Sequence, residues 1–221
     1  MQRKVFDKLA SGVGAALVVI LLVAGGLLTW GTSFANSNVH DQLAQQKIYF
    51  PSQTEINAVK AQYAKGGQKA VTDQEFPNAK LMIPALEPFA GKQVLTGHEA
   101  QIYANDFLGQ HLYAMPYHGV YSQISAAAMT AKPGSAQATQ LDGLKQTSFM
   151  GTTLRGMLLE AYGFGTIGTV MVWGAIASFV GAAVMLILTL LGFRHASRVS
   201  AEERLFDQLK KPADQPKEHV S

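Results

Sequence analysis

Two long apolar runs near the ends of the chain limit its possible folds more than any other feature. The first extends from about Leu9 to Val39 and the second from Ala161 to Phe193, and neither contains Asp, Glu, Lys or Arg. An apolar run of about 18 or more residues can cross the ~30 Å hydrocarbon core of a bilayer as a helix. The sequence therefore predicts a transmembrane helical hairpin whose central residues lie together on one side of the membrane.

The predicted fold class is mainly α, with a small, mostly helical domain between the two spans. The predicted parts are a cytoplasmic N-terminal stub (1–11), a first transmembrane helix (12–34), an extracytoplasmic helical domain (35–162), a second transmembrane helix (163–193) and a cytoplasmic tail (194–221). We expect the helix of the first span to continue into water through Asn38–Gln46.

The basic residues nearest to the spans set the predicted orientation. They precede the first span and follow the second: Arg3, Lys4, Lys8, Arg194 and Arg198. Because cytoplasmic flanks of spans carry an excess of Lys and Arg, we expect both termini in the cytoplasm and the central domain outside. The net charge is only +3, and nothing resembles the basic stripe of a nucleic-acid-binding protein. The predicted surroundings are a lipid bilayer and no nucleic acid.

The chain contains no cysteine, which excludes disulfides, a lipid-attachment cysteine, iron–sulfur clusters, covalent c-type haem and thiolate metal sites. An outward domain without disulfides is common in bacterial envelopes, so a bacterial plasma membrane is the predicted location. A cleaved signal peptide ending at Ser33-Phe34-Ala35 is the alternative. The apolar stretch from Val13 to Trp30 exceeds the about 7–15 residues of a signal-peptide core, which favours a retained span.

Two capping boxes, Ser52-x-x-Glu55 and Thr96-x-x-Glu99, predict helix starts in the central domain. The sequence also predicts an extended piece at 47–51, a first helix to about Lys65 and irregular chain at 68–92. A second helix should run to about Ala114 and end at Pro116, with a short helix at 122–131 after it. A long helical pattern at 137–162, a short helix from Ser200 and a disordered end beyond Lys211 complete the predicted elements. Helical spacing predicts a domain core containing Tyr103, Phe107, Leu108 and Leu112.

The segment Gly163–Gly168 matches G-x-G-x-x-G, the fingerprint of dinucleotide-binding folds. That fingerprint requires a preceding strand, whereas here an amphipathic helix precedes it and a membrane span follows. We therefore interpret the glycines as a place where the helix bends and another helix approaches closely.

The central domain carries four histidines: His40, His98, His111 and His118. Their spacing does not match a helical metal-binding pair, and no G-x-S-x-G nucleophile elbow is present. We expect no catalytic, metal or cofactor site and no enzymatic activity, unless folding brings His111 and His118 together with Asp106 or Glu99.

The spans carry small residues in place of charged ones. Without ionisable groups a pump or transporter core is disfavoured, while small residues allow close helix packing. The predicted packing and interface residues are Gly25, Gly26, Gly165, Gly168, Gly174, Ser178, Gly181 and Ala182.

Several segments carry a resemblance to a known family: Leu95–Ala104, His111-Leu112, Gly119–Ser125, Phe149–Gly163 and Leu191–Arg194. Together they resemble actinobacterial two-span membrane proteins, and in particular association factors of the cytochrome bc1–aa3 respiratory supercomplex. The resemblance covers both spans and the second half of the central domain. It implies integral membrane partners that carry haem, copper and quinone chemistry, and no cofactor in this chain.

The predicted function is a non-catalytic accessory subunit that docks on a larger membrane complex, a respiratory electron-transfer supercomplex if the resemblance holds, and braces or covers it on the extracytoplasmic side. The alternative is an extracytoplasmic ligand-binding or sensing membrane protein. A cavity lined by Tyr49, Tyr63, Tyr103 or Tyr113 would favour that alternative.

Overall fold

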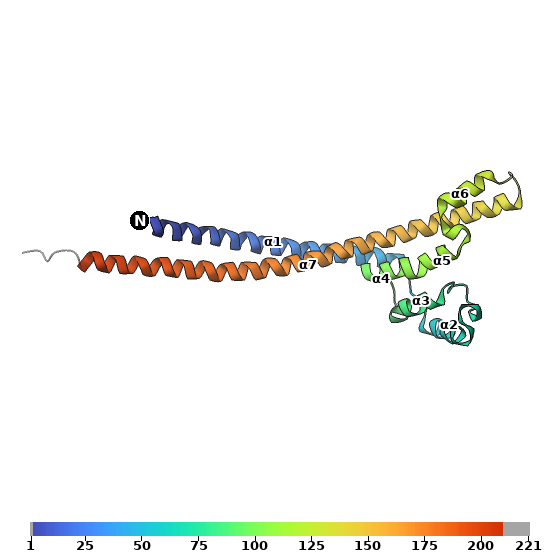
Figure 1. The fold of residues 1–221 in the computed structure, drawn as a ribbon, viewed down its shortest axis with the longest axis horizontal. Coiled ribbons are helices and arrows are strands. Elements are labelled where there is room, and N and C mark those ends of the chain that lie inside the picture. Colours follow the sequence, from blue (N-terminus) through green and yellow to red (C-terminus); the bar gives the residue numbers. More distant parts are fainter. Residues whose placement is uncertain (1, 210–221) are drawn as a thin grey trace, which may run out of the picture. The chain divides into compact units, whose positions relative to one another are not determined.

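The computed structural model describes the backbone of residues 2–209, and the side chains of residues 9–195, 197 and 198. Within this range the chain is mostly helical, as predicted, and two helices are long and apolar enough to span a membrane. These are α1 (Gln2–Gln46) and α7 (Ala136–Leu209) (Figure 1). The chain forms two compact units. One contains the residues up to Trp30 and from Met171 onward, and the other contains Gly31–Val170.

Both long helices extend well beyond their apolar cores. Helix α1 continues through Asn38–Gln46, as expected. Helix α7 runs without interruption from Ala136 through the glycine motif, and the separate tail helix predicted from Ser200 is wrong because that segment is the end of α7. No proline lies between Pro133 and Pro212, so nothing in the sequence forces α7 to stop. The predicted disordered end, beyond Lys211, falls outside the described residues.

Helix α2 (Gln53–Gly66) begins at the first predicted capping box. The Ser52 hydroxyl accepts a hydrogen bond from the Glu55 amide at 3.2 Å, and the Glu55 carboxylate accepts one from the Ser52 amide at 2.6 Å. These bonds to the charged form lower the pKa of Glu55. A short 3₁₀ turn, η1 (Gly67–Ala70), follows where Gly67 adopts a positive φ of 63°.

The second capping box also forms, and it opens a helix that runs to Ala114 as predicted. Its middle is a π-helix that the sequence did not predict, so the structure divides it into α4 (Gly97–Ile102), η3 (Tyr103–Leu108) and α5 (Gly109–Ala114). The turn η4 (Pro116–Gly119) and helix α6 (Tyr121–Thr130) follow. The predicted stop at Pro116 and the short helix after it are therefore confirmed.

The prediction of irregular chain at 68–92 is wrong in its second half. That segment contains helix α3 (Ala79–Leu86) and the turn η2 (Glu87–Phe89), although Pro84 lies inside α3. Proline inside a helix costs about 3 kcal/mol. Burial of Met82 and Leu86, which are fully inaccessible to solvent, offsets this cost.

One hydrophobic core holds the Gly31–Val170 unit together. Its fully buried large side chains come mainly from α2, α3 and the segments next to them: Phe76, Leu43, Ile56, Met82, Leu86, Val59, Val94 and Leu158. Of the predicted core residues, Tyr103, Phe107 and Leu108 pack against its edge. Leu112 lies elsewhere, against Gly151.

Two short extended segments close one side of this core. The Phe50 amide donates to the Lys92 carbonyl and the Val94 amide to the Ile48 carbonyl, each at 2.9 Å, around a single antiparallel bridge between Tyr49 and Gln93. The extended conformation predicted for residues 47–51 is thus present from Ile48 onward, whereas Lys47 lies in a turn with a positive φ of 52°.

Two leucines of α3 provide a matched test of this core. Leu86→Ala should lower the free energy of unfolding of the central domain by about 2–5 kcal/mol, because it leaves a cavity at a fully buried position. Leu81→Ala, in the same helix but 51% exposed, should change it by less than about 1 kcal/mol. Pulse proteolysis in urea, on the full chain in nanodiscs, measures both. Equal losses would contradict the assignment of the core.

Candidate functional site

In the unit that contains both apolar helices, small residues lie where α1 and α7 meet. A Cβ atom built on Gly25 would lie 2.9 Å from the Phe179 ring, and one built on Gly174 would lie 3.1 Å from Leu28. A Cβ at Gly25 would require the Phe179 ring to move, and one at Gly174 would press on the Leu28 side chain, so the two helices approach closely here.

The other predicted packing residues of this unit divide between the shared face and the outside. A Cβ built on Gly181 would lie 3.5 Å from the Leu21 side chain. Ala182 is buried and Ser178 is partly buried. Nothing lies within 4 Å of a Cβ built on Gly26. Gly26 therefore faces away from α7, unlike its neighbour Gly25.

The less exposed residues of the two helices form a stripe that repeats about every seven residues. In this unit they are Ser11, Gly14, Ala15, Val18, Leu21, Ala24, Gly25 and Leu28 on α1, and Met171, Gly174, Ala175, Ser178, Gly181, Ala182, Met185, Thr189 and Gly192 on α7. Two helical turns per repeat give an average period of about 3.5 residues, which is that of a left-handed coiled coil. The contacts of Leu21 with Gly181 and of Leu28 with Gly174 make the pair antiparallel.

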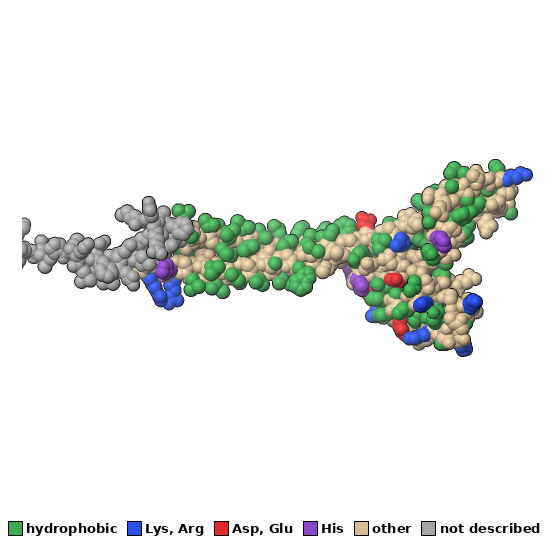
Figure 2. Space-filling model, in the orientation of Figure 1, with side chains coloured by type: hydrophobic (Ala, Val, Ile, Leu, Met, Phe, Trp, Pro, Cys, Tyr) green, Lys and Arg blue, Asp and Glu red, His purple; other side chains and the backbone are tan. Residues whose placement is uncertain are grey.

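The opposite faces of both helices expose large apolar side chains (Figure 2). They include Val19, Ile20, Val23 and Leu27 on α1 and Ile176, Val180, Ile187 and Leu191 on α7. Soluble monomers rarely expose contiguous apolar surface of this extent. Apolar surface of this extent is typical of helices that are covered by lipid or by other apolar surfaces.

The glycine motif at Gly163–Gly168 has a packing role in the Gly31–Val170 unit. A Cβ on Gly165 would lie 3.2 Å from the Cα of Gly97, and one on Gly168 would lie 2.8 Å from the Asn36 side-chain oxygen. At this motif α7 therefore lies close to Gly97 and Asn36, and the helix continues through it without interruption.

The four histidines of the central domain make separate local contacts. His98 packs on Phe89, and His40 lies beside Asp41. The Nδ1 atoms of His111 and His118 lie 2.8 and 3.1 Å from the carbonyl oxygens of Phe107 and Tyr113. Among the described residues no three His, Cys, Asp or Glu side chains converge as a metal site would require.

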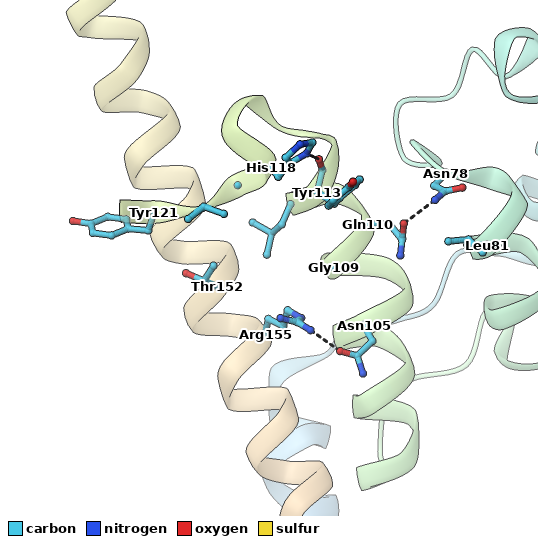
Figure 3. Close-up of a pocket in the computed structure, with 13 residues that line it drawn as sticks. Asn78, Leu81, Asn105, Gly109, Gln110, Tyr113, His118, Tyr121, Thr152 and Arg155 are labelled. Atoms are coloured by element: carbon cyan, nitrogen blue, oxygen red, sulfur yellow. Dashed lines mark hydrogen bonds between the residues drawn. The ribbon is translucent and has the colours of Figure 1, made fainter. Parts of the chain in front are cut away.

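An open groove of about 670 Å³ lies between α3, α5, the turn η4 and α7 (Figure 3). Leu81 and Asn78 come from α3, Gln110 and Tyr113 from α5, His118 from η4, and Thr152 and Arg155 from α7. Tyr113 is the only one of the four tyrosines named for a ligand cavity that lines this groove. Tyr63 and Tyr103 pack on the core instead, and Tyr49 is exposed.

Arg155 joins α7 to the π-helix at the floor of this groove. Its Nε donates to the Ala104 carbonyl at 3.1 Å and its Nη2 donates to the Asn105 side-chain oxygen at 2.8 Å. A Cβ on Gly109 would lie 3.7 Å from Arg155 Nε and 3.3 Å from the Ala104 oxygen. A side chain at this position would touch the guanidinium at ordinary van der Waals distance and would approach the Ala104 oxygen more tightly.

The turn at the rim of the groove has an unusual backbone. Tyr117, His118 and Gly119 have consecutive positive φ angles of 59°, 51° and 66°. A left-handed conformation at a residue other than glycine costs about 1–3 kcal/mol, and such residues cluster at functional sites. The buried Ser148 hydroxyl, which donates to the Gly119 carbonyl at 2.6 Å, ties this turn to α7.

The sequence does not predict the groove. In the sequence Arg155 is only a basic residue that precedes the predicted second span, and no sequence signal marks the π-helix that it contacts. The sequence also does not predict three successive residues in the left-handed conformation, since Gly119 is the only one of the three whose residue type favours it.

No model of a known protein family matches the chain, and the searches of curated proteins and of solved structures found no similar protein.

Gly97, which contacts α7, and Gly163, which lies within α7, give a matched test of the packing. Gly97→Ala should lower the stability of the central domain by about 1–3 kcal/mol, because its Cβ would lie 2.8 Å from the Ala161 carbonyl oxygen. Gly163→Ala, with nothing within 4 Å, should raise stability by up to about 1 kcal/mol. Pulse proteolysis measures both. The packing role is wrong if Gly97→Ala is neutral.

Proposed function

We propose that the chain is a non-catalytic accessory subunit of a larger membrane complex, anchored by a two-span helical hairpin. The observation that carries this proposal is the division of the helix pair into two kinds of surface. Small residues such as Gly25 and Gly174 face inward, while large apolar side chains face outward. A pair built in this way is held together by close packing and offers its outer faces to lipid and to partner helices.

Two tryptophans support a placement in the bilayer. Trp30 and Trp173 are 68% and 69% exposed, and the contact of Leu28 with Gly174 puts them at similar levels of the antiparallel pair. Tryptophan favours the membrane interface. From the level of the two tryptophans, residues 9–30 form about 33 Å of helix at ~1.5 Å per residue. This length is close to the ~30 Å thickness of the hydrocarbon core. We propose spans of 9–30 and 173–194, shifted from the predicted 12–34 and 163–193.

The basic residues next to the other end of the pair support the orientation. Arg194 ends the proposed second span and Arg198 follows it, and three further basic residues lie before the first span in the sequence. Both termini are then cytoplasmic and the Gly31–Val170 unit is extracytoplasmic. Under this orientation Arg155 and its groove face the exterior of the cell.

The groove is the surface of the outer domain best suited to docking. It is open and mostly apolar, and its lining includes Tyr113 and Arg155. Tyrosine and arginine are enriched at the centres of protein–protein interfaces. The family resemblance suggests that the partners are the haem- and copper-bearing subunits of a cytochrome bc1–aa3 respiratory supercomplex, with redox chemistry in those subunits.

A ligand-binding or sensing protein is the second candidate. The volume of the groove, about 670 Å³, falls within the range of small-molecule sites. Its open shape favours docking over enclosure of a ligand.

Purification in a mild detergent, by a tag on this chain, tests the accessory role. We expect the chain to elute with integral membrane subunits in fixed stoichiometry and with the absorbance of haem. Recovery of the chain alone, as a monomer, would contradict the role.

A cysteine pair tests the hairpin directly, because the chain has no cysteine of its own. Leu21→Cys combined with Gly181→Cys should cross-link on oxidation, since these positions are in contact. The matched control combines Ile20→Cys, on the exposed face, with Gly181→Cys and should not cross-link. A protease site inserted at Pro133-Gly134 reports the result as fragments that stay joined without reductant. Separate fragments from the first pair would contradict the hairpin.

A further inference from the structure

The charge of Arg155 is not compensated within the described part of the chain. A guanidinium has five N–H donors, and its two acceptors here, the carbonyl of Ala104 and the side-chain amide oxygen of Asn105, are neutral. No described carboxylate lies within ion-pair distance of it. No acidic side chain lines the groove either. A partly buried cation with spare donors attracts an anionic group, and a carboxylate matches the guanidinium geometry best.

The surroundings of Arg155 indicate what carries that carboxylate. Tyr113, Leu81 and Val120 line the groove and are 64%, 51% and 39% exposed. Such apolar surface gains from being covered by apolar side chains of a partner. Because the groove is open to solvent, it suits an extended or helical protein segment better than a small molecule, which needs a more enclosed site.

The walls of the groove are held in place before anything binds. The Asn78 side chain donates to Gln110 at 3.0 Å and so links α3 to α5 (Figure 3). His118 stacks on Tyr113, with ring centroids 4.4 Å apart, and its Nδ1 lies 3.1 Å from the Tyr113 carbonyl. A preformed surface lowers the entropic cost of association.

We propose that this groove binds a segment of a partner protein that presents an Asp or Glu side chain to Arg155, flanked by apolar side chains that cover Leu81, Tyr113 and Val120. The proposal rests on the accessory role and deepens it, since it names the chemistry of the docking segment on the extracytoplasmic side.

The probe is a library of random 12-residue peptides displayed on phage and selected on the full chain in nanodiscs. We expect enrichment of sequences in which one acidic residue lies between apolar residues. Replacing that residue in a selected peptide, Asp by Asn or Glu by Gln, should weaken binding about tenfold or more in fluorescence polarisation. Enrichment without an acidic residue, or no enrichment, would overturn the proposal.

Variants of the chain separate charge recognition from folding, because Arg155→Gln also removes the bond to Ala104. Leu81→Lys and Leu81→Glu change an exposed position of the groove and no hydrogen bond of Arg155. The Lys variant should bind the selected acidic peptide about fivefold or more tightly than the Glu variant, and the difference should shrink with added salt. The matched controls are Met129→Lys and Met129→Glu, because Met129 is 78% exposed on α6 and does not line the groove. These two variants should bind the selected peptide equally. A ratio near one at Leu81 would contradict the proposal.

The accessory role and the docking chemistry fail separately. Co-purification of membrane subunits without acidic peptide selection would keep the role and reject this groove as its acidic-segment site. If the chain always purifies alone but still selects acidic peptides, the docking chemistry would be kept and the accessory role would be rejected. Saturation of the groove by decanoate, with no peptide enriched, would replace the protein segment by a small amphipathic carboxylate and overturn the proposal.

Discussion

Close packing of α1 against α7 through small residues is the constraint on which the proposed architecture depends. Phe179 packs on Gly25 and Leu28 packs on Gly174, so the two helices are in van der Waals contact along a repeat of about 3.5 residues. The large apolar side chains are consequently left on the outside. In water these faces would associate or aggregate, whereas in a bilayer they match their surroundings.

The central domain also uses glycines for close helix packing and adds long-range polar contacts. Gly97 and Gly165 allow α4 to lie directly against α7, and Arg155 reaches the π-helix beside Gly109. Long-range hydrogen bonds from Arg155 and Ser148 then attach the helix α4–α5 and its turn to α7. The groove forms between elements that these contacts hold in place, and Arg155 is the one Lys or Arg side chain that lines it.

Local signals in the sequence predicted much of this fold. Both capping boxes, the stop at Pro116 and the long apolar helices depend on short-range patterns, and all are present. Helix α3 was missed because Pro84 argues against a helix locally, while burial of Met82 and Leu86 comes only from tertiary structure. The groove was missed for the same reason, since Arg155 meets Ala104 across 51 positions of chain.

Labelling of single engineered cysteines with a membrane-impermeant maleimide tests the central claim, a membrane hairpin with an outward domain, most directly. Met129→Cys, in the outer domain, should be labelled in intact cells. Ser197→Cys, beyond the second span, should be labelled only after the membrane is permeabilised. Equal labelling of both positions in intact cells, or protection of Met129→Cys, would contradict the account.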